Sequence, residues 1–198
     1  MSDDTSSITT RFSLEGKKAV LTGASKGIGA AIAQVLAEAG ADLVLSGRDE
    51  ADLATPAASV RAMGRTAHVV PADLMKAEGA RALGRRAVEI FGTVDILVNC
   101  AGIALVAPFE ELTQQMWDDT MAVNLTAPFA LTQEIVPGMI AQGHGKIINI
   151  ASQTGVIAAD DHAAYAASKG GLVSLTKVLA GELGRHNIQV NAVCPTVI

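Results

Sequence analysis

The chain has 198 residues, of which 49% are hydrophobic and 18% charged, a composition that excludes a disordered protein and suits one domain. Its 15 Lys and Arg against 20 Asp and Glu leave a net charge of −5 without a basic stripe, which argues against nucleic-acid binding. No apolar run reaches the roughly 18 residues of a membrane span, and the polar, acidic start lacks the plan of a signal peptide.

Composition and cysteine usage together predict a soluble cytoplasmic protein. We expect a flexible arm over residues 1–11 and a single domain over residues 12–198. The two cysteines, Cys100 and Cys194, match no metal spacing. Each ends an apolar run, so we expect buried free thiols in a reducing compartment and no metal site.

Short apolar runs alternate with longer amphipathic segments from residue 17 onward. The expected strands cover residues 19–21, 42–46, 66–70, 94–98, 146–150 and 188–193. The expected helices cover residues 28–39, 50–63, 75–91, 113–142 and 163–183, and Pro128 and Pro137 are expected to interrupt the fourth. This alternation of nearly wholly apolar strands with helices indicates β-α-β units covered on both faces. The predicted fold is an α/β doubly wound parallel sheet of order 3-2-1-4-5-6, with its ligand at the carboxyl ends of the strands.

A glycine-rich turn, TGASKGIG, follows the first expected strand and opens the first expected helix. Gly23, Gly27 and Gly29 permit a tight turn and let backbone N–H groups approach a pyrophosphate at the helix N-terminus. The absence of Lys-Ser/Thr after the last glycine excludes a P-loop. An ordinary strand-helix turn remains the alternative.

The same turn fits a second motif, the Gly-x-Ser-x-Gly elbow of the α/β-hydrolases, with Ser25 as nucleophile. Two features argue against it. No earlier loop precedes the first strand to supply an oxyanion hole, and no acid followed by a histidine stands at strand ends. His144 lies in a glycine-rich turn, and His186 lies near a helix end.

The second expected strand ends in Ser-Gly-Arg-Asp. An acid about 20 residues beyond the glycines would bind the 2′-OH of NAD, whereas an arginine would accommodate the 2′-phosphate of NADP. Asp49 falls near the acidic position, but it suits the N-cap of the next helix. Arg48, with Lys26 in the first loop, therefore favours NADP. The alternative for Arg48 is a solvated surface charge.

Polar and small residues follow the third and fourth expected strands. Asp73 could bind adenine, and Asn99 precedes small residues that let the backbone approach a cofactor. Each taken alone is more often a helix cap or a loop turn. Asn124 lies in a mostly apolar helix, where a buried amide needs partners.

Three residues in the last third of the chain form a potential catalytic set. Tyr165 and Lys169 are four residues apart and share one helix face, and Ser152 follows the fifth expected strand. Taken alone, such a Tyr-Lys pair occurs often by chance, with side chains that only pack or lie on the surface. Its position opposite a glycine loop favours chemistry.

The segments TGASKGIG, NCAG, AVNL, NIAS and YAASK, taken together, strongly resemble the short-chain dehydrogenase/reductase family from about residue 12 to the C-terminus. The resemblance implies a Rossmann fold that carries out NAD(P)-dependent oxidation of alcohols or reduction of ketones. It also implies a homo-oligomer, expected to be a tetramer. The small residues of the last helix would allow close helix-helix approach, although the same residues could pack inside one subunit.

The resemblance also implies residue roles. Tyr165 is similar to the general acid/base, Lys169 to its activator and ribose clamp, Ser152 to the carbonyl donor, and Asn124 to the residue that holds a helix kink and a relay water. Asp73 would contact adenine and Asn99 would brace the sheet. The remaining cofactor residues implied are Gly23, Ser25, Lys26, Gly27, Ile28, Gly29, Arg48, Leu74, Ala101, Gly102, Pro195 and Thr196.

The implied chemistry agrees with general acid-base physics. A free phenol has a pKa near 10, too high for a base at neutral pH. A neighbouring ammonium and an oxidised nicotinamide both favour the phenolate. In reduction Tyr165 would give a proton to the oxygen while the cofactor delivers hydride to the carbon.

The end of the sequence departs from the family pattern. Family members commonly have Pro-Gly after the sixth strand, where this chain has Pro195-Thr196. Relatives continue through a lid over the substrate and a seventh strand. We therefore expect six strands in this chain, which is either a fragment of a longer protein or a protein that ends before these parts. This departure bears on activity more than on cofactor binding.

The function predicted from the sequence is an NADP-preferring oxidoreductase for a secondary alcohol or its ketone, with NAD as the less favoured cofactor. Sugars, polyols or hydroxy and keto acids are the first expected substrates. A 3-oxoacyl thioester reductase is the alternative within the class. A protein that senses NADP without turnover is the alternative from another class.

Overall fold

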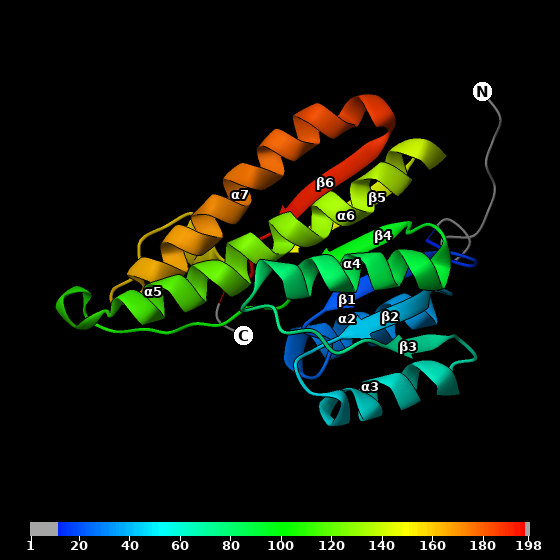
Figure 1. Ribbon diagram of the computed structural model, residues 1–198, viewed down its shortest axis with the longest axis horizontal. Coiled ribbons are helices and arrows are strands. Elements are labelled where there is room, and N and C mark those ends of the chain that lie inside the picture. The colour runs from blue at the N-terminus through cyan, green and yellow to red at the C-terminus, as the bar shows by residue number, and fades with distance from the viewer. Residues whose placement is uncertain (1–11, 197–198) are drawn as a thin grey trace.

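A six-stranded parallel sheet forms the centre of the protein, which a computed structural model describes from residue 12 to residue 196. The strand order is β3-β2-β1-β4-β5-β6, which confirms the predicted doubly wound α/β fold (Figure 1). The strands are β1 (Lys18–Thr22), β2 (Asp42–Ser46), β3 (Ala67–Val69), β4 (Ile96–Asn99), β5 (Gly145–Ile150) and β6 (Ile188–Val193). The arm predicted at residues 1–11 lies outside the described residues.

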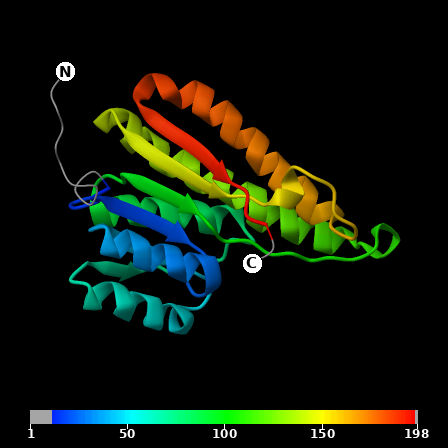
Figure 2. The same cartoon turned by 180° about the vertical axis from the view of Figure 1, so that it is seen from behind.

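Helices cover both faces of the sheet and bury its apolar strands. α2 (Gly27–Glu38) and α3 (Glu50–Ala62) pack on one face (Figure 2). α4 (Ala77–Phe91), α6 (Ala127–Gln142) and the end of α7 (Ala163–Leu183) pack on the other. Burial on two faces is the reason why the strand sequences are almost wholly apolar.

The long helical segment differs from the sequence prediction. α5 (Gln114–Met121) continues through a π-helical segment, Ala122–Thr126, into α6. Pro137 lies inside α6 without ending it, so the predicted interruption there is wrong. Pro128 falls in the first turn of α6 and has no N–H to give to the carbonyl of Asn124. The irregular turn therefore lies on Asn124, just before the proline.

The start of α4 and the burial of the two cysteines also differ from the sequence predictions. α4 begins at Ala77 rather than at Met75, because the Asp73 carboxylate accepts the Met75 N–H at 3.1 Å and closes a turn there. Cys194 is exposed and Cys100 only half-buried, so neither thiol is fully buried as expected. No helix among residues 12–196 is long and apolar enough to cross a membrane.

The small-residue face of α7 is partly used within the subunit. A Cβ on Gly171 would lie 2.8 Å from Leu125, and a Cβ on Gly170 would lie 3.2 Å from the carbonyl oxygen of Gly155. These glycines let α7 approach the π-helical segment and the turn after β5. They serve internal packing, the alternative that the sequence left open, and the homo-oligomer stays a prediction.

Candidate active site

A cleft of about 670 Å³ opens at the carboxyl edge of the sheet. All six parallel strands end at this edge. The chain leaves the adjacent strands β1 and β4 toward helices on opposite faces of the sheet, and doubly wound sheets bind ligands at such a point. Most of the predicted site residues line the cleft: Gly23, Ser25, Lys26, Ile28, Gly29, Arg48, Asp73, Leu74, Ala101, Gly102, Ser152, Tyr165, Lys169, Pro195 and Thr196. The predicted residues outside the lining are Gly27, Asn99 and Asn124.

Glycine is required at two positions of the loop after β1. Gly23 has φ +68°, and a Cβ there would lie 2.7 Å from the Cα of Ala101. A Cβ on Gly29 would lie 2.0 Å from the carbonyl oxygen of Gly23. The loop can therefore fold tightly onto α2 only without side chains, which leaves backbone N–H groups at the helix N-terminus facing the cleft.

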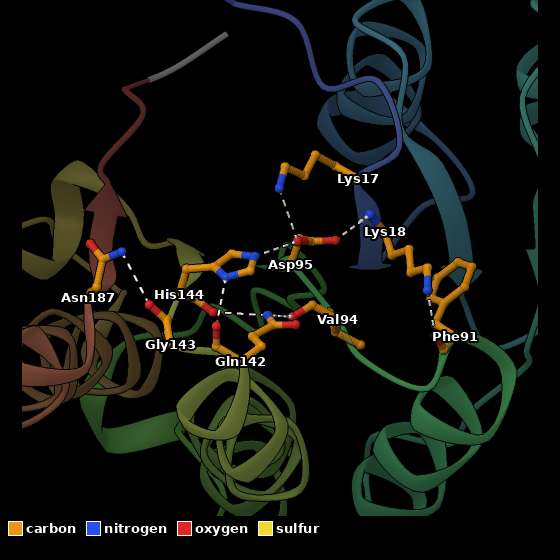
Figure 3. A network of polar contacts seen from close by, with 9 residues as sticks. All are labelled: Lys17, Lys18, Phe91, Val94, Asp95, Gln142, Gly143, His144 and Asn187. Atoms are coloured by element: carbon orange, nitrogen blue, oxygen red, sulfur yellow. Dashed lines mark hydrogen bonds and ion pairs between the residues drawn. The ribbon is translucent and has the colours of Figure 1, made fainter.

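The alternative reading of this loop as a hydrolase elbow is wrong. His144, the histidine of interest, pairs with Asp95, its Nε2 lying 2.9 Å from Oδ1 of the carboxylate. Figure 3 shows this pair with Lys17 and Lys18, residues that precede or begin strands at the amino edge of the sheet. Ser25 follows β1 at the carboxyl edge, about 15–20 Å away along a strand of this length. No triad can form.

The residues predicted to choose between cofactors are exposed. Arg48 has a side chain that is 84% exposed, and its Nε lies 3.6 Å from the Asp49 carboxylate. Asp49 occupies the N-cap of α3 as expected, but its side chain caps no N–H group. Lys26 is likewise exposed, at the N-cap of α2. Arg48 and Lys26 are thus accessible to a phosphate, and Asp49 is a competing partner for Arg48.

A buried polar chain crosses the sheet behind the cleft. Asn99 donates from Nδ2 to Oδ1 of Asn149 at 2.8 Å, and Asn149 donates to the Thr176 hydroxyl at 2.8 Å. β4, β5 and α7 are thereby linked. Asn149 and Thr176 were not predicted from the sequence, although a lone Asn in the apolar run of β5 is a signal of a buried polar contact.

Asn124 is fully buried and holds the loop after β4. Its Nδ2 donates to the carbonyl of Ile103 at 2.8 Å and to the Ser168 hydroxyl at 3.0 Å, and its Oδ1 accepts the Ile103 N–H at 2.8 Å. Ser168 in turn donates to the carbonyl of Tyr165 at 2.7 Å. The partners that the sequence demanded for this amide are therefore the cleft wall and the first turns of α7. Ser168 was not predicted.

Ser152, Tyr165 and Lys169 come together at one end of the cleft. The Lys169 side chain is buried, with the residue 3% exposed, and its Nζ donates to the carbonyl of Ile150 at 2.7 Å. That Nζ lies 5.8 Å from the centre of the Tyr165 ring. The Ser152 hydroxyl is nearly buried and accepts the N–H of Thr154 at 3.2 Å.

Burial sets the electrostatics of Lys169. It lowers the pKa of this ammonium from 10.5 to about 8, while the Cys100 and Cys194 thiols oppose the shift. Burial also raises the pKa of the Cys100 thiol, against the effect of Lys169. Lys169 is therefore charged at neutral pH and can exchange its proton at moderately alkaline pH. A cation, a phenol and a hydroxyl at one cleft end form a set that can protonate or deprotonate a bound oxygen.

Comparisons with known proteins agree with this arrangement. The family model described as short chain dehydrogenase matches residues 17–198. The chain is 44% identical over 94% of its length to an NAD-dependent glycerol dehydrogenase of Listeria innocua, covering 72% of that protein. It is 43% identical over 94% of its length to a D-threitol dehydrogenase of Mycolicibacterium smegmatis, also covering 72%. A crystal structure of a gluconate 5-dehydrogenase from Burkholderia cenocepacia, in complex with NADP and tartrate, superimposes with a TM-score of 0.89 at 39% identity, covering 95% of this chain and 74% of that one.

Proposed function

Because the chain belongs to the short-chain dehydrogenase family, we propose that it interconverts a secondary alcohol and its ketone with NADP, using Tyr165 as general acid/base. The relatives compared above are named as dehydrogenases of glycerol, threitol and gluconate, all of which carry CH–OH groups. The observation that carries the proposal is the buried, charged Lys169 beside the Tyr165 ring at the end of the cleft.

A dinucleotide fits the residues at the other end of the cleft. A Cβ at Gly23 or Gly29 would close the loop, so the two glycines keep space and backbone donors for a pyrophosphate. Arg48 and Lys26 would hold a 2′-phosphate, and Asp73 would contact adenine. Lys169 would hold the ribose. When bound, the nicotinamide supplies or accepts the hydride.

The chain's own residues supply position and proton transfer. Ser152 would donate a hydrogen bond to the reacting oxygen, and Tyr165 would give it a proton in reduction or take one in oxidation. The Lys169 charge favours the phenolate form of Tyr165. Asn124 fixes the geometry from behind, because it holds both the cleft wall at Ile103 and, through Ser168, the first turn of α7.

The preference for NADP over NAD rests on the two accessible cations. Charge-assisted bonds to a phosphate contribute about 1.5–3 kcal/mol each. The bound NADP of the Burkholderia structure supports the same choice, whereas the Listeria relative is named as NAD-dependent. NAD is therefore the competing cofactor.

Tyr165→Phe tests the proposal, because it removes one hydroxyl and leaves the ring. We expect about a 10²–10⁴-fold loss of kcat, measured by nicotinamide absorbance with polyols, and unchanged NADP binding by calorimetry. Ser174→Ala is the control, since it removes an exposed hydroxyl from the same helix. Full activity in Tyr165→Phe would refute the mechanism. NADP binding without turnover of any alcohol, ketone or 3-oxoacyl thioester would instead favour the sensor.

A further inference from the structure

In the part of the chain that the structure describes, none of the cations that line the cleft is free to pair with a charged group on a substrate beside Tyr165. Four charged residues line the cleft, Lys26, Arg48, Asp73 and Lys169. Lys26, Arg48 and Asp73 follow β1, β2 and β3, on the glycine-loop side. Lys169 is buried, bonded to the Ile150 carbonyl and beside Tyr165. At the end that holds Ser152 and Tyr165, the remaining lining side chains, including Ile103, Ala104 and Thr196, carry no charge.

The segment of the chain that leads from the cleft wall at Ile103 to the first turns of α7 has few cations. Between Ile103 and Ser168 the sequence has seven Asp and Glu, and Lys146 is its only Lys or Arg. Lys146 lies at the start of β5, at the opposite edge of the sheet, where its Nζ donates to Gln189. A carboxylate on the substrate would therefore meet no countercharge from this segment.

Two of these acids, Asp160 and Asp161, come shortly before Tyr165 in the sequence. Asp160 and Asp161 are exposed in the loop that leads into α7, whose first turn carries Tyr165. The His162 ring lies 6.1 Å from the Tyr165 ring, centre to centre, in an edge-on arrangement. The carbonyl of Asp161 accepts the Ala107 N–H at 3.0 Å, which ties this loop to the segment after Ile103 and Ala104. In Figure 1 the green segment before α5 and the orange start of α7 lie at this same end.

We call the exposed loop that carries Asp160 and Asp161 the rim. Its carboxylates favour neutral substrates over anionic ones. A carboxylate accepts hydrogen bonds and donates none, so it can bind a hydroxyl but only repels another carboxylate. Moving an anion out of water without a partner is costly as well. Resting on the proposed function, we propose that the chain selects small neutral polyols and their ketoses over sugar acids, hydroxy acids and anionic thioesters.

The test compares substrates that differ only in charge. Xylitol and xylonate, or erythritol and erythronate, share a carbon skeleton in which one terminal CH₂OH becomes COO⁻. We expect kcat/KM to be about tenfold or more higher for the neutral member of each pair, because the anion lacks a partner. A higher kcat/KM for the aldonates would overturn the inference and leave the proposed function standing. No turnover of either member, with NADP or NAD, would refute the substrate class, and no turnover of any alcohol or ketone would refute the proposed function as well.

A variant ties the selectivity to the rim. Asp160→Asn with Asp161→Asn removes both charges, and asparagine tolerates the φ of 60° at position 161. We expect kcat/KM for xylonate to rise roughly twofold to fourfold at low salt, the gain to fade at high salt, and xylitol to be unaffected. Glu182→Gln is the matched control, because it removes the same charge from the far end of α7, about 25 Å from Tyr165. An equal gain in the control, or none in the rim variant, would show that these acids do not select the substrate.

Discussion

Replacing Lys169 by methionine should stabilise the folded chain at neutral pH while it abolishes turnover. Burial lowers the pKa of Lys169 from 10.5 to about 8, so the folded chain holds this proton less tightly than the unfolded chain does. The gap corresponds to about 3 kcal/mol of stability lost at every pH below about 8, where the lysine is charged in both states. Methionine has no charge to bury.

The substitution also has a cost. The carbonyl of Ile150 now accepts a hydrogen bond from Nζ at 2.7 Å and would lose that donor. A buried group left without a partner costs about 1–3 kcal/mol, so we expect a net gain of up to about 2 kcal/mol at pH 7. Between about pH 8 and 10.5 the folded chain loses the Lys169 proton first and the penalty disappears. The advantage of Lys169→Met should therefore shrink and then reverse as the pH rises.

Urea unfolding of the cofactor-free protein, followed by Trp117 fluorescence at pH 7 and pH 9.5, measures both effects. Lys177→Met is the control, because it removes an exposed lysine from the same helix. The raised pKa of Cys100 contributes to the pH dependence with the opposite sign, and loss of the Lys169 charge would raise that pKa further. A Lys169→Met chain that is less stable by the same margin at both pH values would refute the reasoning.

Three further outcomes follow from the structure. Arg48→Asp should weaken NADP binding by about tenfold or more and favour NAD in isothermal titration; equal NAD and NADP binding by the unmutated protein would contradict this. Gly29→Ala should cost about 1–3 kcal/mol in urea unfolding and abolish NADP binding, because its Cβ would meet backbone at 2.0 Å, whereas Gly138→Ala meets nothing within 4 Å and should be neutral or stabilising. Asp95→Asn should cost about 1–2 kcal/mol at pH 7 and progressively less below about pH 4, since stability from a lowered carboxyl pKa is lost in acid; a pH-independent loss would refute it.

The direction of the Asp95 pKa shift comes from the contacts that its carboxylate makes at the amino edge of the sheet (Figure 3). Burial alone would raise the pKa of this carboxyl, but the backbone N–H of Lys18, the His144 ring and the Lys17 ammonium lower it further than burial raises it. Oδ2 accepts from the Lys18 N–H at 2.9 Å, and Oδ1 faces Lys17 at 3.3 Å and His144 at 2.9 Å. The contacts of the carboxylate thus stabilise the folded state at pH values above the unfolded pKa of Asp95. This stabilisation disappears as the pH falls through the pKa of the folded state.

Periodicity and composition predicted the fold because the strands are apolar on both faces and glycines stop several helices. The strand order of the sheet was confirmed, and a cleft opens at the edge where the ligand was predicted. The prediction that both prolines interrupt the helix was wrong at Pro137, because packing keeps this proline inside α6. The irregular turn at Asn124 has no sequence signal other than the proline that follows it. Segment ends depended on side-chain hydrogen bonds, such as that of Asp95 at the start of β4, which no propensity encodes.

The residues that touch the cleft could be predicted, and those that hold them could not. Glycines, Tyr165 and Lys169 stand in short local motifs, so their spacing is visible in the sequence. Asn149 and Thr176 act through partners on other elements, at positions 50 and 27 residues apart along the chain. Such pairs need the sheet register to be known before they can be recognised.

These hidden partners make the end of the cleft that holds Tyr165 a cooperative unit. Asn124 bonds to Ile103 and Ser168, and Ser168 donates to the carbonyl of Tyr165, while in a separate network Asn149 donates to Thr176 two turns further along α7. Removing one member leaves the others buried without a partner, and the loss exceeds that of a single bond. The placement of Tyr165 therefore depends on the buried Asn124 amide behind the cleft, and changes at Asn124 should alter kcat and stability together.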